Sequence, residues 1–402
     1  MMPVVSFGGL LVVAAVAFAA PLALGFFPRF RLPSPVLEIA LGIAIGPAGL
    51  GWVTLDEPIR ILALVGLAFL LFLGGLEIEV ERLRGRLLGL AGLGLVASLS
   101  IALATSLVFK AAGLVESPLL VAVILTSTGL GVLIPILKDA GQTRTELGQL
   151  VIVWASLADF GAIILLALLF SRDASGPGSR AVLLVGFALV CAAVGFGIAR
   201  GGRSARVTAT IERLQDTTAQ IRVRGSMVLL IGLAAVAESL GLETILGAFL
   251  AGAILSAIDR DRMMTHPHFR VKLEAMGFGL FVPVFFVASG LTFDLHALTS
   301  SPSALARVPL FAAALLLVHV VPVVALAGRS LGTRRALGAG LYEATTLSFV
   351  VAAVQIGASL GLVGPATGAA LVAAGLLSVL IFPLVAGGLL GESGVPLVET
   401  AP

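Results

Sequence analysis

The sequence predicts an all-α membrane protein whose chain crosses the bilayer about thirteen times. Hydrophobic residues make up 59% of its 402 residues and charged residues only 12%, and its mean hydropathy is +1.14. The apolar residues form repeated runs, most of them long enough to cross a hydrocarbon layer about 30 Å thick at about 1.5 Å per residue. Soluble globular chains have neither this composition nor these runs, so we expect a polytopic protein embedded in the lipid bilayer.

The apolar runs can be taken in order along the chain, with one helix expected from each. The first has no positively charged stretch before it, so we expect a retained helix and not a cleaved signal. The second and the ninth are short, and we expect them to tilt less or to begin in the interface. The thirteen runs are 5–27, 35–52, 58–76, 86–110, 117–138, 146–171, 181–200, 223–241, 243–258, 273–293, 306–328, 333–358 and 364–390.

The basic residues support this count and predict an orientation. With the N-terminus outside, 20 of the 25 Lys and Arg residues fall in connections that face the cytoplasm, as the positive-inside rule requires. One lost helix would scramble this sorting, so we expect an odd number of crossings in a cell membrane, with the C-terminus cytoplasmic. The cytoplasmic set is Arg29, Arg31, Arg82, Arg84, Arg86, Lys138, Arg144, Arg200, Arg203, Arg206, Arg213, Arg222, Arg224, Arg260, Arg262, Arg270, Lys272, Arg329, Arg334 and Arg335. The opposite set is Arg60, Lys110, Arg172, Arg180 and Arg307.

The longest polar connection, 201–222, divides the runs into six, a seventh, and six more. Two halves of six helices on either side of a linker helix have opposite orientations in the membrane. This organisation is typical of an inverted-repeat secondary transporter. The expected organisation is a first inverted repeat at 1–171, a linker helix and cytoplasmic loop at 172–222, a second inverted repeat at 223–390, and a short cytoplasmic tail at 391–402.

Asp159 is the only ionisable residue between Leu147 and Phe170, and it lies about halfway along its helix. A carboxylate at the centre of a span costs about 2.5–3.5 kcal/mol on insertion scales. Either a proton or a metal cation can neutralise it, so one carboxyl group can exchange the two. The alternative is a structural hydrogen bond to a neighbouring helix. Because mid-membrane charges mostly mark transport pathways, we favour a functional role.

Besides Asp159, three acidic residues lie well within apolar runs. Glu38 is expected to cap or brace a helix end, and Glu238, which flanks a tight turn together with Glu243, is expected at the outer interface. Glu343 stays open between a structural and a functional role at this point.

Two segments contain the residues of interrupted helices. TSTGLGVLIP at 126–135 combines three hydroxyls, two glycines and a proline in mid-span, and GLYEATTLSFV at 340–350 is similarly polar. They lie in the fifth and twelfth runs, which are corresponding positions of the two halves. Interrupted helices expose unpaired backbone groups that can coordinate ions. The alternative is that small residues only let helices pack closely.

Several other function classes are disfavoured. The GASLG pattern around Ser359 follows no predicted strand, GLGLVA at 92–97 lies inside a span without a βαβ context, and Cys191 is the only cysteine. The net charge of +3 is spread over loops, which does not suggest nucleic-acid binding. We therefore expect no enzyme activity and no cofactor. A symporter of organic anions would need more polar groups at mid-membrane.

Nearly the whole chain resembles the monovalent cation:proton antiporter-2 family, which includes sodium/proton and Kef-type potassium/proton antiporters. The resemblance implies a core domain with two crossed broken helices, a separate dimerisation domain, and therefore a homodimer. The family's ion-binding aspartate falls on Asp159, and its broken helices fall on 126–135 and about 342–349. The resemblance is carried by VLEIALGIAIGPAGLG (36–51), LAFLLFLGGLEIE (67–79), ILTSTGLGVLIPILKDAG (124–141), the helix of Asp159, RVRGSMVLLIGLAAVAESLGLETILGAFLAG (222–252) and FFVASGLTFDL (285–295).

The chain departs from this family at three informative places. Ala158 stands where electrogenic members resemble one another in having a first aspartate, and His319 where they have the lysine paired with it. Many members also have Gly-Glu where this chain has Thr-Leu at Thr346, so Glu343 could substitute as a ligand. Losing both members of an ion pair together avoids a lone buried charge. We therefore hypothesise electroneutral one-to-one exchange.

The resulting hypothesis is a secondary transporter that exchanges Na⁺ or K⁺ for protons by alternating access. Asp159 binds the metal cation directly, and its partners are monovalent cations, protons and the bilayer. The channel-like potassium efflux protein is the alternative function. The further ion- and proton-binding candidates are Thr126, Ser127, Thr128, Glu343 and Thr346, with His319 and Ser156 as auxiliary groups.

Overall fold

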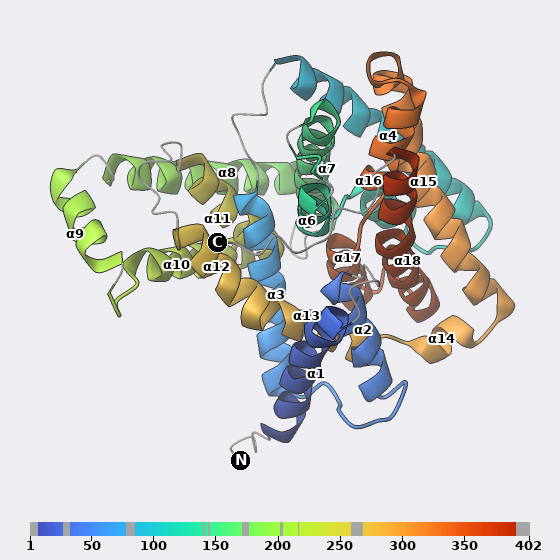
Figure 1. Cartoon of the computed structure of the whole chain (residues 1–402), viewed down its shortest axis with the longest axis horizontal. Coiled ribbons are helices and arrows are strands. Elements are labelled where there is room, and N and C mark those ends of the chain that lie inside the picture. Colours follow the sequence, from blue (N-terminus) through green and yellow to red (C-terminus); the bar gives the residue numbers. More distant parts are fainter. Residues whose placement is uncertain are drawn as a thin grey trace. The chain divides into compact units, whose positions relative to one another are not determined.

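A computed structural model describes residues 7–26, 33–77, 85–139, 141–143, 145–170, 177–201, 204–215, 217–258 and 268–390. Throughout this part of the chain the regular structure is helical (Figure 1). The helices are α1 (Phe7–Phe26), α2 (Ser34–Ile45), α3 (Glu57–Leu76), α4 (Gly85–Ala111), α5 (Pro118–Thr126), α6 (Leu130–Asp139), α7 (Glu146–Phe170), α8 (Pro177–Gly201), α9 (Ala205–Gln215), α10 (Ile221–Ser239), α11 (Thr244–Ile258), α12 (His268–Met276), the π-helical η1 (Gly277–Phe281), α13 (Val282–Leu291), α14 (Leu295–Thr299), α15 (Pro302–Leu331), α16 (Thr333–Glu343), α17 (Ser348–Ser359) and α18 (Pro365–Leu390).

The prediction of an all-α polytopic membrane protein is confirmed. Each predicted apolar run contains a helix or a consecutive set of helices, while α9 and α14 lie between runs. In the described part of the chain, 8 helices are long and apolar enough to span a membrane, or up to 9 if the bent pair α16–α17 forms one span. As expected, the second and ninth runs form short helices, α2 with 12 residues and α11 with 15.

Some predicted features lie outside the described residues. They are the tail at 391–402, part of the linker at 172–222, and the basic residues Arg29, Arg31, Arg82, Arg84, Arg144, Arg172, Arg203, Arg260 and Arg262.

The chain forms two compact units, each assembled from separate stretches of sequence. The first unit contains residues 1–56, 82–162 and 286–402, and the second contains 57–81 and 163–285. Both predicted repeats, 1–171 and 223–390, contribute stretches to both units. The first unit contains both pairs of half-helices, α5–α6 and α16–α17, as the expected core domain should. The assignment of the two halves as inverted repeats stays a prediction.

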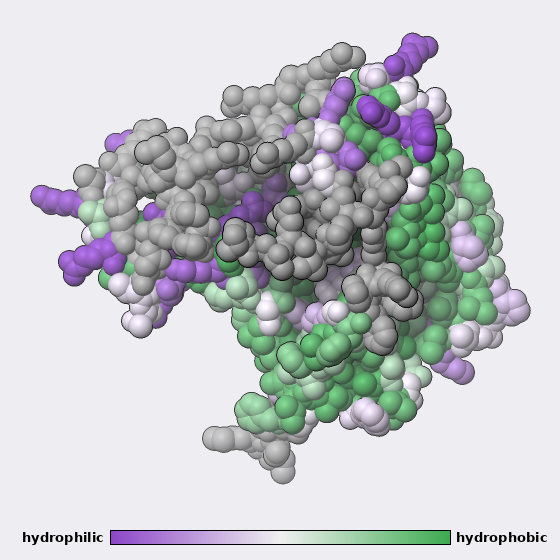
Figure 2. All heavy atoms as spheres, in the orientation of Figure 1, coloured by the Kyte–Doolittle hydropathy of each residue, from purple (hydrophilic) through white to green (hydrophobic). Residues whose placement is uncertain are grey.

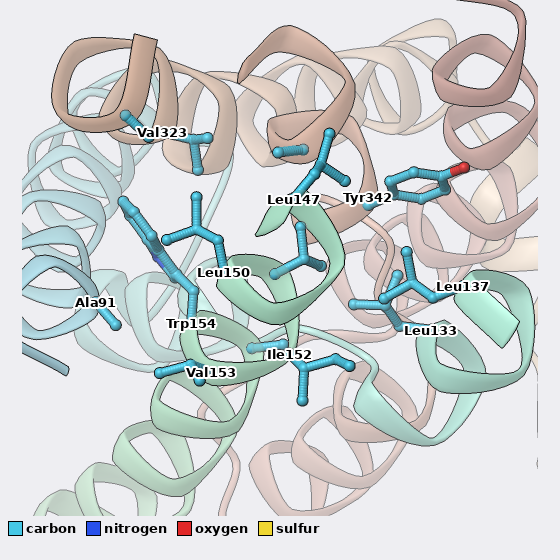
Figure 3. Close-up of a cluster of buried hydrophobic side chains, with 14 of the residues drawn as sticks. Ala91, Leu133, Leu137, Leu147, Leu150, Ile152, Val153, Trp154, Val323 and Tyr342 are labelled. Carbon is cyan, nitrogen blue, oxygen red and sulfur yellow. The ribbon is translucent and has the colours of Figure 1, made fainter. Parts of the chain in front are cut away.

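The hydrophobic core of the first unit surrounds the N-terminal half of α7 (Figure 3). Trp154 of α7 is buried and packs near Ala91 of α4, while Leu150 lies close to Val323 of α15. A side-chain atom at Gly94 would overlap the Trp154 indole ring, so the glycine makes the room that this ring fills. The packing anchors α7 one and a half turns before Asp159.

The second unit relies on close helix contacts at glycines. Side-chain atoms at Gly75 of α3 and Gly252 of α11 would overlap the backbone oxygens of Phe249 and Phe72, respectively. Small residues let membrane helices approach to backbone contact, where dispersion forces hold them together. Phe69 stacks on Phe281 with 5.4 Å between ring centroids, which joins α3 to η1.

Large apolar areas cover the surface that Figure 2 shows, with hydrophilic residues toward its margins. The best spanning windows of α1 and of Val182–Gly201 in α8 are only 11% buried. This much exposed apolar surface belongs in contact with lipid or another membrane protein. The chain is a multi-pass membrane protein.

Candidate functional site

Two broken helices meet at their breaks in the first unit. Helix α5 ends at Thr126 and α6 begins at Leu130, while α16 and α17 are bent by 42° at residues 344–347. The Gly129 N–H donates to the Thr345 carbonyl at 2.8 Å, which joins the two breaks through their backbones. A side-chain atom at Gly129 would lie 3.2 Å from that carbonyl oxygen, so a larger residue would push the second break back by a few tenths of an ångström. The predicted helix interruptions are confirmed at both places.

The first break follows from local hydrogen bonding. The Ser127 hydroxyl donates to the Ile124 carbonyl at 2.8 Å, and the Ser127 N–H bonds the same oxygen at 3.3 Å. Serine and threonine hydroxyls compete with the helix ladder in this way. The carbonyl that would receive the Thr128 N–H in a continuous helix is thereby occupied, and this N–H is free to bond elsewhere.

Asp159 accepts the hydrogen bonds that the first break releases. The Thr128 N–H donates to its Oδ1 at 2.8 Å, and the Leu130 N–H donates to its Oδ2 at 3.2 Å. Both donors lie at the N-terminal end of α6, where the helix dipole favours negative charge. These bonds offset part of the cost of a mid-membrane carboxylate. Asp159 is half-buried, whereas Glu343 and the hydroxyl residues of the breaks are fully buried.

Glu343 lies beside Asp159 and shares a partner with it. The Thr128 hydroxyl donates to Glu343 Oε2 at 3.3 Å, and Glu343 is 0% exposed. Its Oε1 has no hydrogen-bond partner among the described residues. The two carboxyl groups are close enough for their charges to repel each other. Glu343 also ends α16, so it sits at a negative helix end. The sequence left the role of Glu343 open between structural and functional. The structure places this residue at the meeting point of the two breaks.

The candidate hydroxyl groups divide into two sets. Ser127 Oγ and Thr346 Oγ1 lie 3.4 Å apart, one from each break, and both residues are buried. Thr126 and Ser156 instead donate to the carbonyls one turn earlier in their own helices, at 2.8 Å and 2.7 Å. The Ser127 and Thr346 hydroxyls therefore connect the two breaks. The Thr126 and Ser156 hydroxyls bond only within their own helices.

His319 lies in α15 and is 1% exposed. Its Nδ1 is 3.0 Å from the Leu315 carbonyl, and its Nε2 has no hydrogen-bond partner within the described ranges. The Thr126 carbonyl is close to the ring. Neither ring nitrogen bonds to Asp159, so His319 is a neighbour of the first break and not a direct partner of the aspartate.

Glu38 and Glu238 are the remaining acidic candidates. Glu38 is 3% exposed in the second turn of α2. Glu238 is exposed near the end of α10, beside a turn at Gly241 whose φ of 71° suits glycine. The predicted tight turn is confirmed.

Ser378 was missed by the sequence analysis. It lies in α18 and is 0% exposed, and its Oγ accepts a hydrogen bond from the Thr346 N–H at 3.1 Å. In the sequence it is one small polar residue within a long apolar run. A possible signal was its place three residues after Gly375, in the span that follows the second broken helix.

The sequence matches the family model described as the transmembrane region of the sodium/hydrogen exchanger over residues 14–390. The chain belongs to the sodium/hydrogen exchanger family. The resemblance to monovalent cation:proton antiporters is thereby confirmed.

Curated relatives of this exchanger include bacterial, archaeal and plant proteins. The putative Na⁺/H⁺ antiporter YjbQ of Bacillus subtilis is 30% identical over 94% of this chain, which spans 62% of that protein's length. The probable Na⁺/H⁺ antiporter 3 of Methanocaldococcus jannaschii is 26% identical over 93% of this chain and 94% of its own. The chloroplastic K⁺ efflux antiporter 2 of Arabidopsis thaliana is 31% identical over 67% of this chain and 23% of its own.

A solved structure supports the fold of the exchanger. The sodium proton antiporter MjNhaP1 from Methanocaldococcus jannaschii at pH 8 matches with a TM-score of 0.66 and 19% sequence identity. The match covers 95% of this chain and 97% of that one. The helical arrangement is therefore that of a NhaP-like fold.

Proposed function

We propose that this exchanger carries one monovalent cation, Na⁺ or K⁺, in one direction for one proton in the other. The observation that carries the proposal is the position of Asp159, whose carboxylate receives two backbone N–H groups where both broken helices meet. Relatives named as Na⁺/H⁺ and as K⁺ antiporters support the class of reaction and leave the cation open.

The chemistry follows from the oxygen atoms around Asp159. The ionised carboxylate and nearby hydroxyl and carbonyl oxygens suit a hard monovalent cation. A proton neutralises the same carboxylate, so the proton and the cation displace each other. Ser127, Thr128 and Thr346 are the hydroxyl residues of the breaks that we assign to the cation, and Thr126 and Ser156 support the helices that carry them.

One-to-one exchange requires that Glu343 keeps the same charge throughout, and we assign it the neutral form. Its place at the negative end of α16 and the lack of a partner for Oε1 both disfavour a charge there. Asp159 is at a positive helix end with both oxygens bonded. With Ala158 beside it, α7 supplies one charge to the site, and that charge is balanced equally by H⁺ or by one cation.

Transport proceeds by alternating access in a homodimer with the N-terminus outside and the C-terminus in the cytoplasm. The core domain moves against the dimerisation domain when Asp159 carries a proton or a cation. An empty carboxylate is too costly to move through the apolar barrier. This restriction couples the two fluxes and prevents a leak.

Proteoliposomes with a pH-sensitive dye test the proposal. Na⁺, K⁺ and Li⁺ are added in turn to vesicles that hold a pH gradient, with the wild type, Asp159→Asn and Asp294→Asn. Asp294 caps α14, and Asn caps helices equally well, so it is the matched control. We expect Asp159→Asn to lose exchange and Asp294→Asn to keep it.

An undiminished rate in Asp159→Asn would overturn the proposal. Imposing a membrane voltage in the same vesicles tests the stoichiometry, since an electroneutral rate does not follow voltage. A cation current without proton flux would instead identify the channel-like efflux protein.

A further inference from the structure

Helix α18 holds the unwound segment of the second broken helix with two residues, Gly375 and Ser378. The Ser378 Oγ accepts from the Thr346 N–H at 3.1 Å and lies 2.9 Å from the Thr346 carbonyl oxygen. It also lies 2.7 Å from the Gly375 carbonyl oxygen of its own helix. A side-chain atom at Gly375 would come within 3.1 Å of the Thr346 carbonyl oxygen. The pair therefore holds the two peptide groups on either side of the Thr346 Cα.

The Ser378 hydroxyl has only one proton for two acceptors. A serine hydroxyl donates once and accepts through its lone pairs. With a lone pair already engaged by the Thr346 N–H, the proton can point to the Thr346 carbonyl or to the Gly375 carbonyl. Among the described residues this hydroxyl is the only hydrogen-bond donor to the Thr346 carbonyl. When the proton turns toward Gly375, the Thr346 carbonyl becomes free, while the preceding peptide group stays anchored through the Thr346 N–H.

We propose that Ser378 is a positioning residue that presents the Thr346 carbonyl to the transported cation. The inference rests on the proposed function, in which the cation binds at the meeting point of the breaks. Thr346 belongs to that point, because its hydroxyl lies 3.4 Å from Ser127 Oγ and its neighbour Thr345 bonds to Gly129. Backbone carbonyls replace the water of a bound alkali cation in selective sites.

The anchored carbonyl sets the size of ion that fits. Carbonyl ligands held at a defined position discriminate between ions of different radius, and mobile ligands discriminate less. Ser378 is thus assigned to selectivity among Li⁺, Na⁺ and K⁺ as well as to affinity. Gly375 has the complementary task, since it leaves room for the carbonyl to approach α18.

Ser378→Ala removes both hydrogen bonds, with opposite effects on the cation. Losing the donor frees the carbonyl, while losing the acceptor leaves the Thr346 N–H unpaired and removes the hold of α18 on the unwound segment. The second effect is larger, because an unpaired buried group costs more than a net hydrogen bond contributes. We expect a rise in the apparent KM for the cation of roughly 2- to 12-fold, with a smaller change in maximal rate.

The experiment measures proton flux against cation concentration for Li⁺, Na⁺ and K⁺ in proteoliposomes. Ser378→Thr keeps the hydroxyl and should restore the wild-type KM values. Ser106→Ala is the matched control, because Ser106 is equally buried in α4 and has no hydrogen-bond partner in the described structure. Gly375→Ala should alter the ratio of the KM values without removing a hydrogen bond.

The outcomes separate this inference from the function on which it rests. The inference alone is overturned if the wild type exchanges cations and Ser378→Ala behaves like Ser106→Ala. In that case the KM values for the three ions, and their ratios, are the same in both variants. An equal fall in maximal rate for every ion with unchanged KM also overturns it, because that is the mark of a merely structural serine. Should Ser378→Ala fail to fold, Gly375→Ala and Ser378→Thr decide by the same ratios. A wild type without cation-dependent proton flux overturns the proposed function and this inference together.

Discussion

Replacing Glu343 by glutamine tests whether this carboxyl stays neutral during transport. Glutamine keeps the shape of the side chain and still offers an oxygen to the Thr128 hydroxyl, which donates to Glu343 Oε2 at 3.3 Å. If Glu343 is neutral in the working protein, the variant loses no charge. We then expect exchange to continue, with the pH profile displaced by less than about 0.5 unit, equivalent to about 0.7 kcal/mol.

In the opposite case, in which Glu343 is charged, the structure sets a minimum for the displacement of the pH profile. Thr128 donates its N–H to Asp159 Oδ1 at 2.8 Å and its hydroxyl to Glu343 Oε2 at 3.3 Å. Since about 3 Å separates these two Thr128 atoms, the two carboxyl oxygens are at most about 9 Å apart. Two negative charges at about 9 Å repel by about 1.8 kcal/mol at an effective dielectric constant of about 20, which displaces a titration by about 1.3 pH units.

The assay compares the rate of cation-dependent proton flux as a function of pH for Glu343→Gln, the wild type and the Asp294→Asn control. Removing a charged neighbour would let Asp159 ionise more readily and would move the profile toward acidic pH. A displacement of about 1.3 units or more in that direction would refute a neutral Glu343.

Two further predictions concern glycines at close contacts. Gly94→Ala should destabilise the fold by about 1–3 kcal/mol, because its methyl group overlaps the Trp154 ring. The matched Gly92→Ala, with nothing within 4 Å, should be neutral or stabilise the helix by about 0.5–1 kcal/mol; thermal unfolding in detergent measures both, and equal effects would contradict the packing argument. Gly129→Ala should slow exchange while sparing stability more than Gly94→Ala, because it crowds the Thr345 carbonyl at the meeting point of the breaks; an unchanged transport rate would count against that close approach.

The helices and the breaks could be predicted because their causes are local. Apolar runs mark spans wherever they occur, so the run at 146–171 became α7 almost residue for residue. The Ser-Thr-Gly sequence at 127–129 interrupts a helix for two local reasons. The Ser127 hydroxyl bonds to the Ile124 carbonyl, and Gly129 has no side chain. Asp159 was evident for the same reason, since no other ionisable residue lies between Leu147 and Phe170.

The other features depend on contacts between distant residues, which a single sequence does not show. Glu343 could not be assigned until Thr128, 215 residues earlier, was seen to donate to it. Ser378 is an unremarkable serine in an apolar helix until Thr346 lies against it. The two compact units draw on stretches scattered along the chain, whereas the predicted division followed the chain in order.

The arrangement of the two breaks explains how one small ion could affect a whole domain. Thr128 bonds to Asp159 through its backbone and to Glu343 through its side chain, while Gly129 bonds to the backbone of the second break. A change in the charge of Asp159 alters the strength of its hydrogen bond from the Thr128 N–H. The hydroxyl of the same residue contacts Glu343 at the end of α16. Neither broken helix can therefore adjust to a proton or a cation alone. In the proposed mechanism, this linkage is the reason that the charge at Asp159 has to be balanced before the core domain moves, since an unbalanced charge would strain both breaks at once.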